Sequence, residues 1–250
     1  MPSTGVQVDV CGVTCNTGVP TEDGVTWMVT DVSGWDSPEQ RTGQLAPTGR
    51  HGTVSFASLY GGRILTVSGV VFADTDEDAW AAYYRLCGMM PPLNETGELV
   101  VYETPAKMLT VEQVGPPRVV APVDRFIEFQ LSLLSTFPFR RTLTGTTLPV
   151  ASGATVELTN SGTVAAYPVI TTTASGAVDF TIGGRSFTTD SVPSGTVVDM
   201  WARTITDGSG STLEPWPKHS AAEWLAIPRG SVDLVNVGAA LSVSWHDTYA

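Results

Sequence analysis

Apolar and polar residues alternate with a period of two along much of this chain. The clearest run lies between Arg125 and Leu133. Successive side chains of a β-strand point to opposite faces, so this pattern predicts a half-buried strand. The apolar face of the run consists of Ile127, Phe129, Leu131 and Leu133.

The same alternation predicts further strands in both halves of the chain. Gly183-Gly184 separates two of these runs, and glycine suits the positive φ angles of a two-residue hairpin turn. Residues 207–210 (Asp-Gly-Ser-Gly) predict a second turn. The apolar positions of the runs are Leu65, Val67 and Val71; Val156 and Leu158; Val178, Phe180 and Ile182; and Leu241, Val243 and Trp245.

One segment has the period of a helix. Asp74 and Glu77 form an N-terminal capping pattern, and Gly88 and Pro91 favour an end. Apolar side chains recur between them at i, i+3, i+4 and i+7, so we expect one apolar stripe that packs on a sheet. The stripe consists of Trp80, Tyr83, Tyr84 and Cys87.

A change of composition follows the strand at 125–133. Residues 142–153 are rich in Thr, Gly, Pro and Ser, which places a domain boundary near residue 142. The sequence therefore predicts two domains, 1–141 and 142–250. We expect the first to be β with one helix, and the second to be an all-β sandwich or jelly roll with short strands.

Composition narrows the function classes. The 250 residues carry a formal net charge of −12, which disfavours binding to nucleic acid or to anionic lipid. Only 15% of the residues are charged, which favours a surface partly covered by a partner. No segment reads as a signal peptide or a transmembrane helix, so we expect synthesis in a cytoplasm and a soluble chain.

The sequence carries no familiar catalytic or cofactor-binding motif. It lacks a G-x-S-x-G elbow, a P-loop, a dinucleotide-binding G-x-G-x-x-G and an H-E-x-x-H pair. The acidic run 74–78 fails as a calcium loop, because Ala79 and Arg85 stand where Gly and Glu are needed. The three cysteines, Cys11, Cys15 and Cys87, form neither a disulfide framework nor a zinc motif. We expect no enzyme activity, no metal and no cofactor.

Four of the seven tryptophans fall in the second part of the chain. Their rings could stack on sugars, but tryptophan more often fills sandwich cores and interfaces. Trp245 alternates in phase with core positions, whereas Trp216 lies between Pro215 and Pro217. Trp216 is therefore the candidate glycan contact.

The order of several short motifs resembles the distal tail proteins of long, non-contractile phage tails. The likeness covers nearly the whole chain, with one departure: Phe137-Pro138-Phe139 stands where the family often carries Asp-Pro. The motifs are Gly34-Trp35, Gly49-Arg50-His51-Gly52, Tyr60-Gly61-Gly62-Arg63, Arg85-Leu86, the strand at Phe126, Asn160-Ser161-Gly162-Thr163, Ala166, Pro168-Val169-Ile170 and Ser244-Trp245.

This resemblance implies a structural protein of the virion, located at the tail tip. The first domain would be a barrel-like, ring-forming domain, and six copies would form a hub that continues the tail tube. The second would be a galectin-like sandwich that projects outward. The implied partners are other copies of the chain, the tail tube protein and a tail-tip, fibre or receptor-binding protein. An acidic conduit would let DNA pass without binding it.

Five residues of the first domain are candidates for fixing loops or for contacts within the ring. Gly61-Gly62 would supply the positive φ of a tight turn before a strand. Arg50 and Arg63 flank glycine-rich turns, where a guanidinium could hold backbone carbonyls or a neighbouring carboxylate, or simply face solvent. Tyr60 precedes the second turn.

A different class of function remains open. A carbohydrate-binding module for host cell-wall or surface glycans would use the aromatic residues of the second domain. Such modules normally carry a secretion signal, which this sequence lacks. A glycosidase needs two carboxylates across a cleft, and the sequence pairs no two of them.

Overall fold

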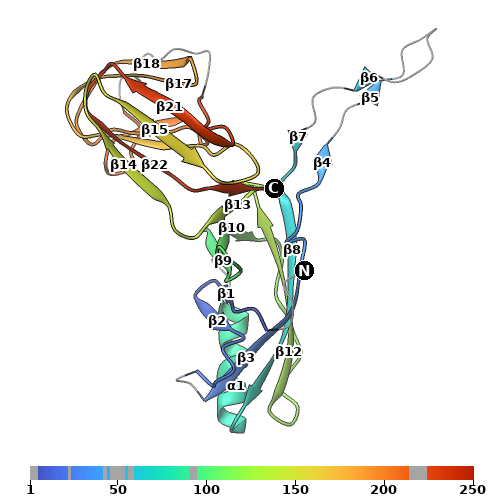
Figure 1. Cartoon of the computed structure of the whole chain (residues 1–250). Coiled ribbons are helices and arrows are strands. Elements are labelled where there is room, and N and C mark those ends of the chain that lie inside the picture. Colours follow the sequence, from blue (N-terminus) through green and yellow to red (C-terminus); the bar gives the residue numbers. More distant parts are fainter. Residues whose placement is uncertain are drawn as a thin grey trace. The chain divides into compact units, whose positions relative to one another are not determined.

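The chain forms two compact units, residues 1–140 together with Ala250, and residues 141–249 (Figure 1). The computed structural model describes residues 5–21, 24–41, 44–45, 54–55, 59–89, 95–213 and 224–250. Both units consist mainly of antiparallel strands, and the only helix within these ranges lies in the first unit. The predicted fold class, mainly β with one helix, is confirmed.

Unit 1 contains a long sheet in the order β2-β1-β9-β10-β12-β8-β3, with β11 paired to β12. Two short ladders, β4–β7 and β5–β6, lie between β3 and β8 in sequence. The elements are β1 (Val8–Val10), β2 (Val13–Cys15), β3 (Val25–Ser33), β4 (Gln40–Arg41), β5 (Gln44–Leu45), β6 (Val54–Ser55), β7 (Leu59–Tyr60), β8 (Arg63–Ala73), α1 (Asp76–Gly88), β9 (Gly97–Val101), β10 (Lys107–Gln113), β11 (Arg118–Val119) and β12 (Phe126–Ser135). The strand β13 (Arg140–Thr142) contains the boundary between the units.

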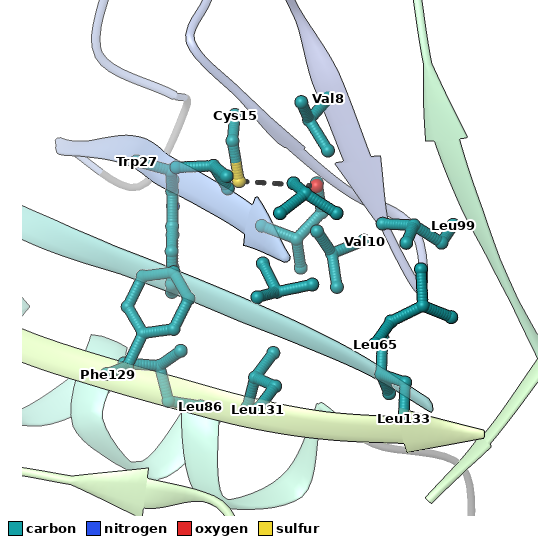
Figure 2. Packing of buried hydrophobic residues seen from close by; sticks show 14 of the residues in the cluster. Val8, Val10, Cys15, Trp27, Leu65, Leu86, Leu99, Phe129, Leu131 and Leu133 are labelled. Atoms are coloured by element: carbon teal, nitrogen blue, oxygen red, sulfur yellow. Dashed lines mark hydrogen bonds between the residues drawn. The ribbon is translucent and has the colours of Figure 1, made fainter. Parts of the chain in front are cut away.

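This sheet curls into a half-barrel around the core of unit 1. Strands β10 and β12 pair at only two positions, Glu112 with Leu134 and Gln113 with Leu133. The sheet can bend sharply at such a short ladder, so that β1 and β9 face β3, β8 and β12 across the core. Figure 2 shows side chains from both parts, among them Val10, Leu65 and Leu131, packed together.

The strongest predicted strand of unit 1 is confirmed. In β12 the side chains of Ile127, Phe129, Leu131 and Leu133 are buried, at most 4% exposed. β8 buries the predicted positions Leu65, Val67 and Val71 in the same way. The two strands pair over ten positions, from Phe126–Phe72 to Ser135–Arg63, so β8 and β12 are hydrogen-bonded along almost their whole length.

The predicted helix exists, but its buried face was predicted wrongly. α1 packs on β3, β8 and β12 through Ala79, Ala82 and Leu86, whereas Trp80 is 46% exposed and Cys87 is exposed. The real stripe is displaced by one residue, about 100° around the helix. Small alanine side chains let the helix approach the sheet closely, and the exposed indole needs no buried hydrogen-bond partner.

The start of α1 also differs from the prediction. Thr75, rather than Asp74, is the N-cap, and its Oγ1 accepts a hydrogen bond from the backbone N–H of Asp78 at 3.1 Å. Acidic residues 76–78 occupy the first turn as expected, where they favour the positive end of the helix dipole.

Unit 2 contains two antiparallel sheets, ordered β14-β22-β16-β19-β20 and β15-β21-β17-β18. Both sheets contribute side chains to one core, so the unit is a β-sandwich. The strands of the two sheets are β14 (Thr146–Val150), β15 (Thr155–Asn160), β16 (Val169–Thr172), β17 (Gly176–Ile182), β18 (Arg185–Val192), β19 (Val197–Asp199), β20 (Thr204–Thr206), β21 (Gly230–Asn236) and β22 (Leu241–Trp245). The short strand β23 (Thr248–Tyr249) lies outside both sheets.

The alternation predicted for unit 2 is confirmed in β17 and β22. Val178, Phe180 and Ile182 are at most 2% exposed, and Val243 is fully buried. Gly183 and Gly184 have φ angles of 57° and 80° and form the turn between β17 and β18. This is the two-residue hairpin that the glycine pair predicts.

Candidate functional site

The candidate site lies in unit 1, where β3 and β8 extend into a long hairpin. The pairing of Ser33 with Thr66 ends the main ladder. Gln40 then pairs with Tyr60, and Leu45 with Val54, in almost the same register. The short ladders β4–β7 and β5–β6 therefore continue the β3–β8 hairpin beyond the sheet, and residues 34–36 and 63 lie at its base.

Arg63 fixes the base of this hairpin. Its side chain begins β8 and is only 3% exposed. Nη1 donates to the carbonyl oxygen of Trp35 at 2.5 Å, and reaches those of Gly34 and Asp36 at 3.5 Å each. One guanidinium thus holds three consecutive carbonyls, and the preceding segment cannot shift without losing these bonds.

Arg63 lies near one other cation, Arg140, and one carboxylate, Asp36. Burial, followed by the nearby charge of Arg140, lowers the pKa of Arg63 to about 10, and Asp36 acts in the opposite direction. The group stays protonated near neutral pH. Its Nε and Nη2 find no hydrogen-bond partner within the described part of the chain, so the guanidinium is only partly satisfied.

Gly34 lets the chain pass close to the backbone of β8 at the base of the hairpin. Its φ angle is 83°, a conformation that L-residues other than glycine rarely adopt. A Cβ at this position would also overlap the carbonyl oxygen of Ile64 on β8. Both features require glycine, and the chain can therefore turn tightly enough to bring Trp35 beside Arg63.

Arg140 and Trp35 complete a cluster around Arg63. The Arg140 guanidinium lies over the Trp35 ring, 5.7 Å from its centroid, and the ring is 2% exposed. Glu103 Oε1 accepts from Lys107 Nζ at 3.1 Å and lies 3.9 Å from Arg140 Nη1. We call Trp35, Arg63, Glu103, Lys107 and Arg140 the hairpin-base cluster. It contains three cations and one carboxylate.

The side chains of the hairpin-base cluster hold other groups in position. Its guanidinium groups hold carbonyls, a ring and a carboxylate, and these are the interactions that fix a loop. Across the described ranges, no group of three or more His, Cys, Asp or Glu side chains is arranged to hold a metal ion. Within the same ranges, no helix is long and apolar enough to cross a membrane.

The structure separates the five residues that the sequence singled out. Arg63 is central to the cluster, while Tyr60 lies at its margin, 36% exposed, with its ring edge-on to Phe139 at 5.1 Å. Gly61 is buried next to it. Arg50 lies outside the described residues.

The positive φ angle predicted for the Gly61-Gly62 pair is wrong at Gly62, whose φ angle is not positive. A Cβ on Gly62 would instead lie 3.3 Å from the carbonyl oxygen of Ser135. The constraint on this position is the close approach of β12.

The sequence analysis missed Glu103, Lys107 and Arg140 as members of the cluster. They come from the β9–β10 connection, β10 and β13, which are far from Arg63 in sequence. No local pattern connects them to Arg63. Only the packing of the sheet brings these charges together.

The tryptophans of unit 2 differ in their exposure. Trp245 is 3% exposed, as its phase predicts, and its Nε1 donates to the Thr159 carbonyl at 3.1 Å. Trp224 is half-buried and packs against Phe187. Trp201 is 43% exposed, with its ring edge-on to Tyr167 at 5.1 Å. Trp216, the candidate glycan contact, lies outside the described residues.

Comparison with known proteins places this architecture among phage tail structures. The crystal structure of SPP1 Dit, described as a paradigm of the hub adsorption apparatus in phages that infect Gram-positive bacteria, superposes with a TM-score of 0.69 at 15% sequence identity. The match covers 98% of this chain and 99% of that one.

A second solved structure agrees with this. A chain of the phage P2 baseplate in its activated conformation matches with a TM-score of 0.52 at 8% identity, over 96% of this chain and 97% of that one. No protein-family model matches the chain, and no curated protein matches its sequence. The chain thus has the fold of these hub and baseplate proteins across both units.

Proposed function

We propose that this protein is the distal tail hub of a long, non-contractile phage tail. It would form a ring, most simply of six copies, that joins the tail tube to the tail-tip, fibre or receptor-binding protein and lets DNA pass. The observation that carries this proposal is the full-length fold match to a Dit protein. Because both units match in their chain order, the likeness extends well beyond a shared β-sandwich.

The surface of unit 1 supports assembly into a ring. Ile64 and Phe72 of β8 are 65% and 46% exposed, and Met28 of β3 is 40% exposed. These residues leave apolar area on the side of the sheet that faces away from the core. A ring subunit must cover two different faces with its neighbours, and exposed apolar side chains suit such contacts.

The charge of the chain fits a conduit for DNA. A net charge of −12 repels phosphates overall, and we expect the lumen of the ring to be neutral to acidic. A ring structure with clustered Lys or Arg along the lumen would contradict this part of the proposal.

The roles of the two units follow from the same proposal. Unit 1, with its curled sheet and long hairpin, would form the ring. Unit 2 would be the galectin-like sandwich and would serve as a structural or docking element. We expect no hydrolase activity on cell-wall polymers, and cleavage by the purified protein would refute the structural role.

Light scattering and negative-stain imaging of the purified chain test the ring directly. We expect closed rings at micromolar concentration, alone or with the tail tube protein. Ile64→Glu in unit 1 should prevent ring formation, and Val237→Glu in unit 2, at 63% exposure against 65%, is the matched control. A chain that stays monomeric even beside the tube protein would overturn the proposal.

Glycan binding by unit 2 is the second candidate function. The exposed ring of Trp201 beside Tyr167 favours it, because aromatic faces can stack on sugars. A glycan array and host cell walls, probed with the full chain, Trp201→Ala and Trp216→Ala, distinguish the two functions. Binding that either substitution abolishes would favour a binding module, and no binding would favour the docking element.

A further inference from the structure

Three aromatic rings form a cluster on the solvent side of α1. Trp80 and Tyr83 lie 5.6 Å apart between ring centroids, Tyr83 and Tyr84 5.5 Å, and Trp80 and Tyr84 6.2 Å. Tyr84 is 67% exposed and Trp80 46% exposed, while Tyr83 partly packs against the core. We call Trp80, Tyr84 and the adjacent Glu77 the α1 aromatic face.

Of these rings, the exposed Trp80 and Tyr84 contribute little to holding α1 on the sheet. Ala79, Ala82 and Leu86 do that from the opposite side of the helix. Large aromatic side chains left in water are the residues that most often carry binding energy at protein interfaces. Mutual edge contacts also restrict the rings before any partner arrives, which reduces the entropy lost on binding.

The polar neighbour of the rings is a carboxylate. Positions 77, 80 and 84 fall within about 60° of one another around a helix, so Glu77 lies on the same face, one turn before Trp80. Ala81 and Gly88 also lie on this face and are small. The α1 aromatic face therefore presents two rings and one carboxylate, with no cation between them.

The other acidic groups of the first turn already have partners. Asp76 Oδ1 accepts from Arg125 Nε at 3.0 Å, and Asp78 Oδ2 accepts from Thr75 Oγ1 at 2.6 Å. Glu77 makes no hydrogen bond or ion pair with any described residue. Its carboxylate is therefore available to a partner.

We propose that the α1 aromatic face binds an arginine-bearing segment of a partner protein. A guanidinium can stack on an indole or phenol ring and at the same time donate two parallel hydrogen bonds to a carboxylate. An ammonium is compact and more strongly hydrated, so lysine would satisfy the same face less well. The inference goes beyond the hub proposal and does not depend on ring formation.

A second copy of this chain fits the face less well. In a symmetric self-contact the same patch meets itself, so Glu77 and the acidic first turn would lie opposite their own counterparts. Like charges in such a contact repel, and the chain as a whole is acidic.

Fluorine NMR of the fluorotryptophan-labelled full chain gives a direct readout, with the Trp80 signal assigned by Trp80→Phe. The probes are a short acetylated Arg-Gly-Arg peptide, its lysine counterpart and its uncharged citrulline counterpart. We expect the arginine peptide to shift the Trp80 signal in a saturable way, the lysine peptide to bind several-fold more weakly, and the citrulline peptide to bind weakest.

Two variants test whether peptide binding depends on the α1 aromatic face or only on the net negative charge of the chain. Glu77→Gln should weaken the arginine peptide about threefold, since exposed ion pairs are modest, whereas Glu98→Gln on the exposed side of β9 should change nothing. Equal binding of all three peptides, or an unchanged affinity in Glu77→Gln, would overturn the proposal. A Trp80 signal that shifts with protein concentration alone would also overturn it, in favour of a self-contact.

Discussion

At the scale of single residues, Arg63 is the side chain whose environment departs furthest from what its type predicts. Arginine is seldom buried without a carboxylate partner, yet Arg63 is 3% exposed and donates to backbone carbonyls. The bonds orient residues 34–36 at the point where the hairpin leaves the sheet. Because the Arg63 guanidinium holds the backbone by hydrogen bonds, the stability of the fold should depend on these donors.

Arg63→Met tests that role, because methionine keeps much of the apolar stem and removes every donor. We expect a loss of about 1–3 kcal/mol in the free energy of unfolding, since the Trp35 carbonyl would be left without its partner. Urea titration measures it. Arg118→Met, at an exposed position of β11, should stay within about 0.5 kcal/mol of the wild type. Equal losses in both variants would contradict the positioning role.

The buried thiol of Cys15 gives a prediction about pH. Burial, and secondarily the charge of Asp9, raises the pKa of Cys15 to about 12, although Arg85 acts in the opposite direction. In the unfolded chain the thiol has its ordinary pKa of 9.0, so the unfolded state loses the proton first as the pH rises. The stability carried by this neutral thiol is thus fully present below about pH 9 and is lost progressively toward pH 12.

Cys15→Val should therefore flatten the fall of the unfolding free energy between about pH 9 and pH 11. Denaturant titrations under reducing conditions provide the curves. Cys87→Val, at an exposed position on α1, serves as control and should follow the wild type. If the curves for Cys15→Val and wild type stay parallel throughout, another group controls the alkaline loss.

At the scale of elements, α1 shows how a correct period can be assigned to the wrong face. Apolar residues at 80, 83, 84 and 87 satisfy the helical spacing, but so do 79, 82, 83 and 86. The sheet below α1 accepts the second set because two alanines and one leucine let the backbones approach. Trp80 and Tyr84 stay outside, where their polar atoms meet water.

Stability measurements distinguish the two faces. Trp80→Ala should cost less than about 1 kcal/mol, because the indole is half exposed, whereas Leu86→Ala should cost about 2–5 kcal/mol by leaving a cavity under α1. Both values come from urea unfolding of the full chain. A larger loss for Trp80→Ala than for Leu86→Ala would mean that α1 packs on the sheet through its Trp80 side.

At the scale of the whole molecule, the chain has two cores. Unit 1 gathers its buried side chains between the two parts of the curled sheet, and unit 2 gathers its own between two sheets. A unit with its own continuous core of this size can fold cooperatively without the other.

We therefore expect residues 142–250, expressed alone, to unfold in a single urea transition. Phe180 is fully buried between the sheets, so Phe180→Ala should cost about 3–5 kcal/mol in the isolated unit and the same amount in the full chain. Agreement of the two losses supports an independent unit. A broad transition, or binding of a hydrophobic dye at low denaturant, would show that unit 2 needs unit 1.

By itself the sequence determined the strands β8, β12, β17 and β22, the glycine hairpin of β17–β18, the presence of α1 and the mainly β class. These features depend on the pleat of a strand and on allowed φ angles, which are local properties of the backbone. Only the tertiary structure decided which face of α1 is buried and which charges surround Arg63. Those outcomes depend on distant strands that pack together, and no local period records which surface a helix or a guanidinium will meet.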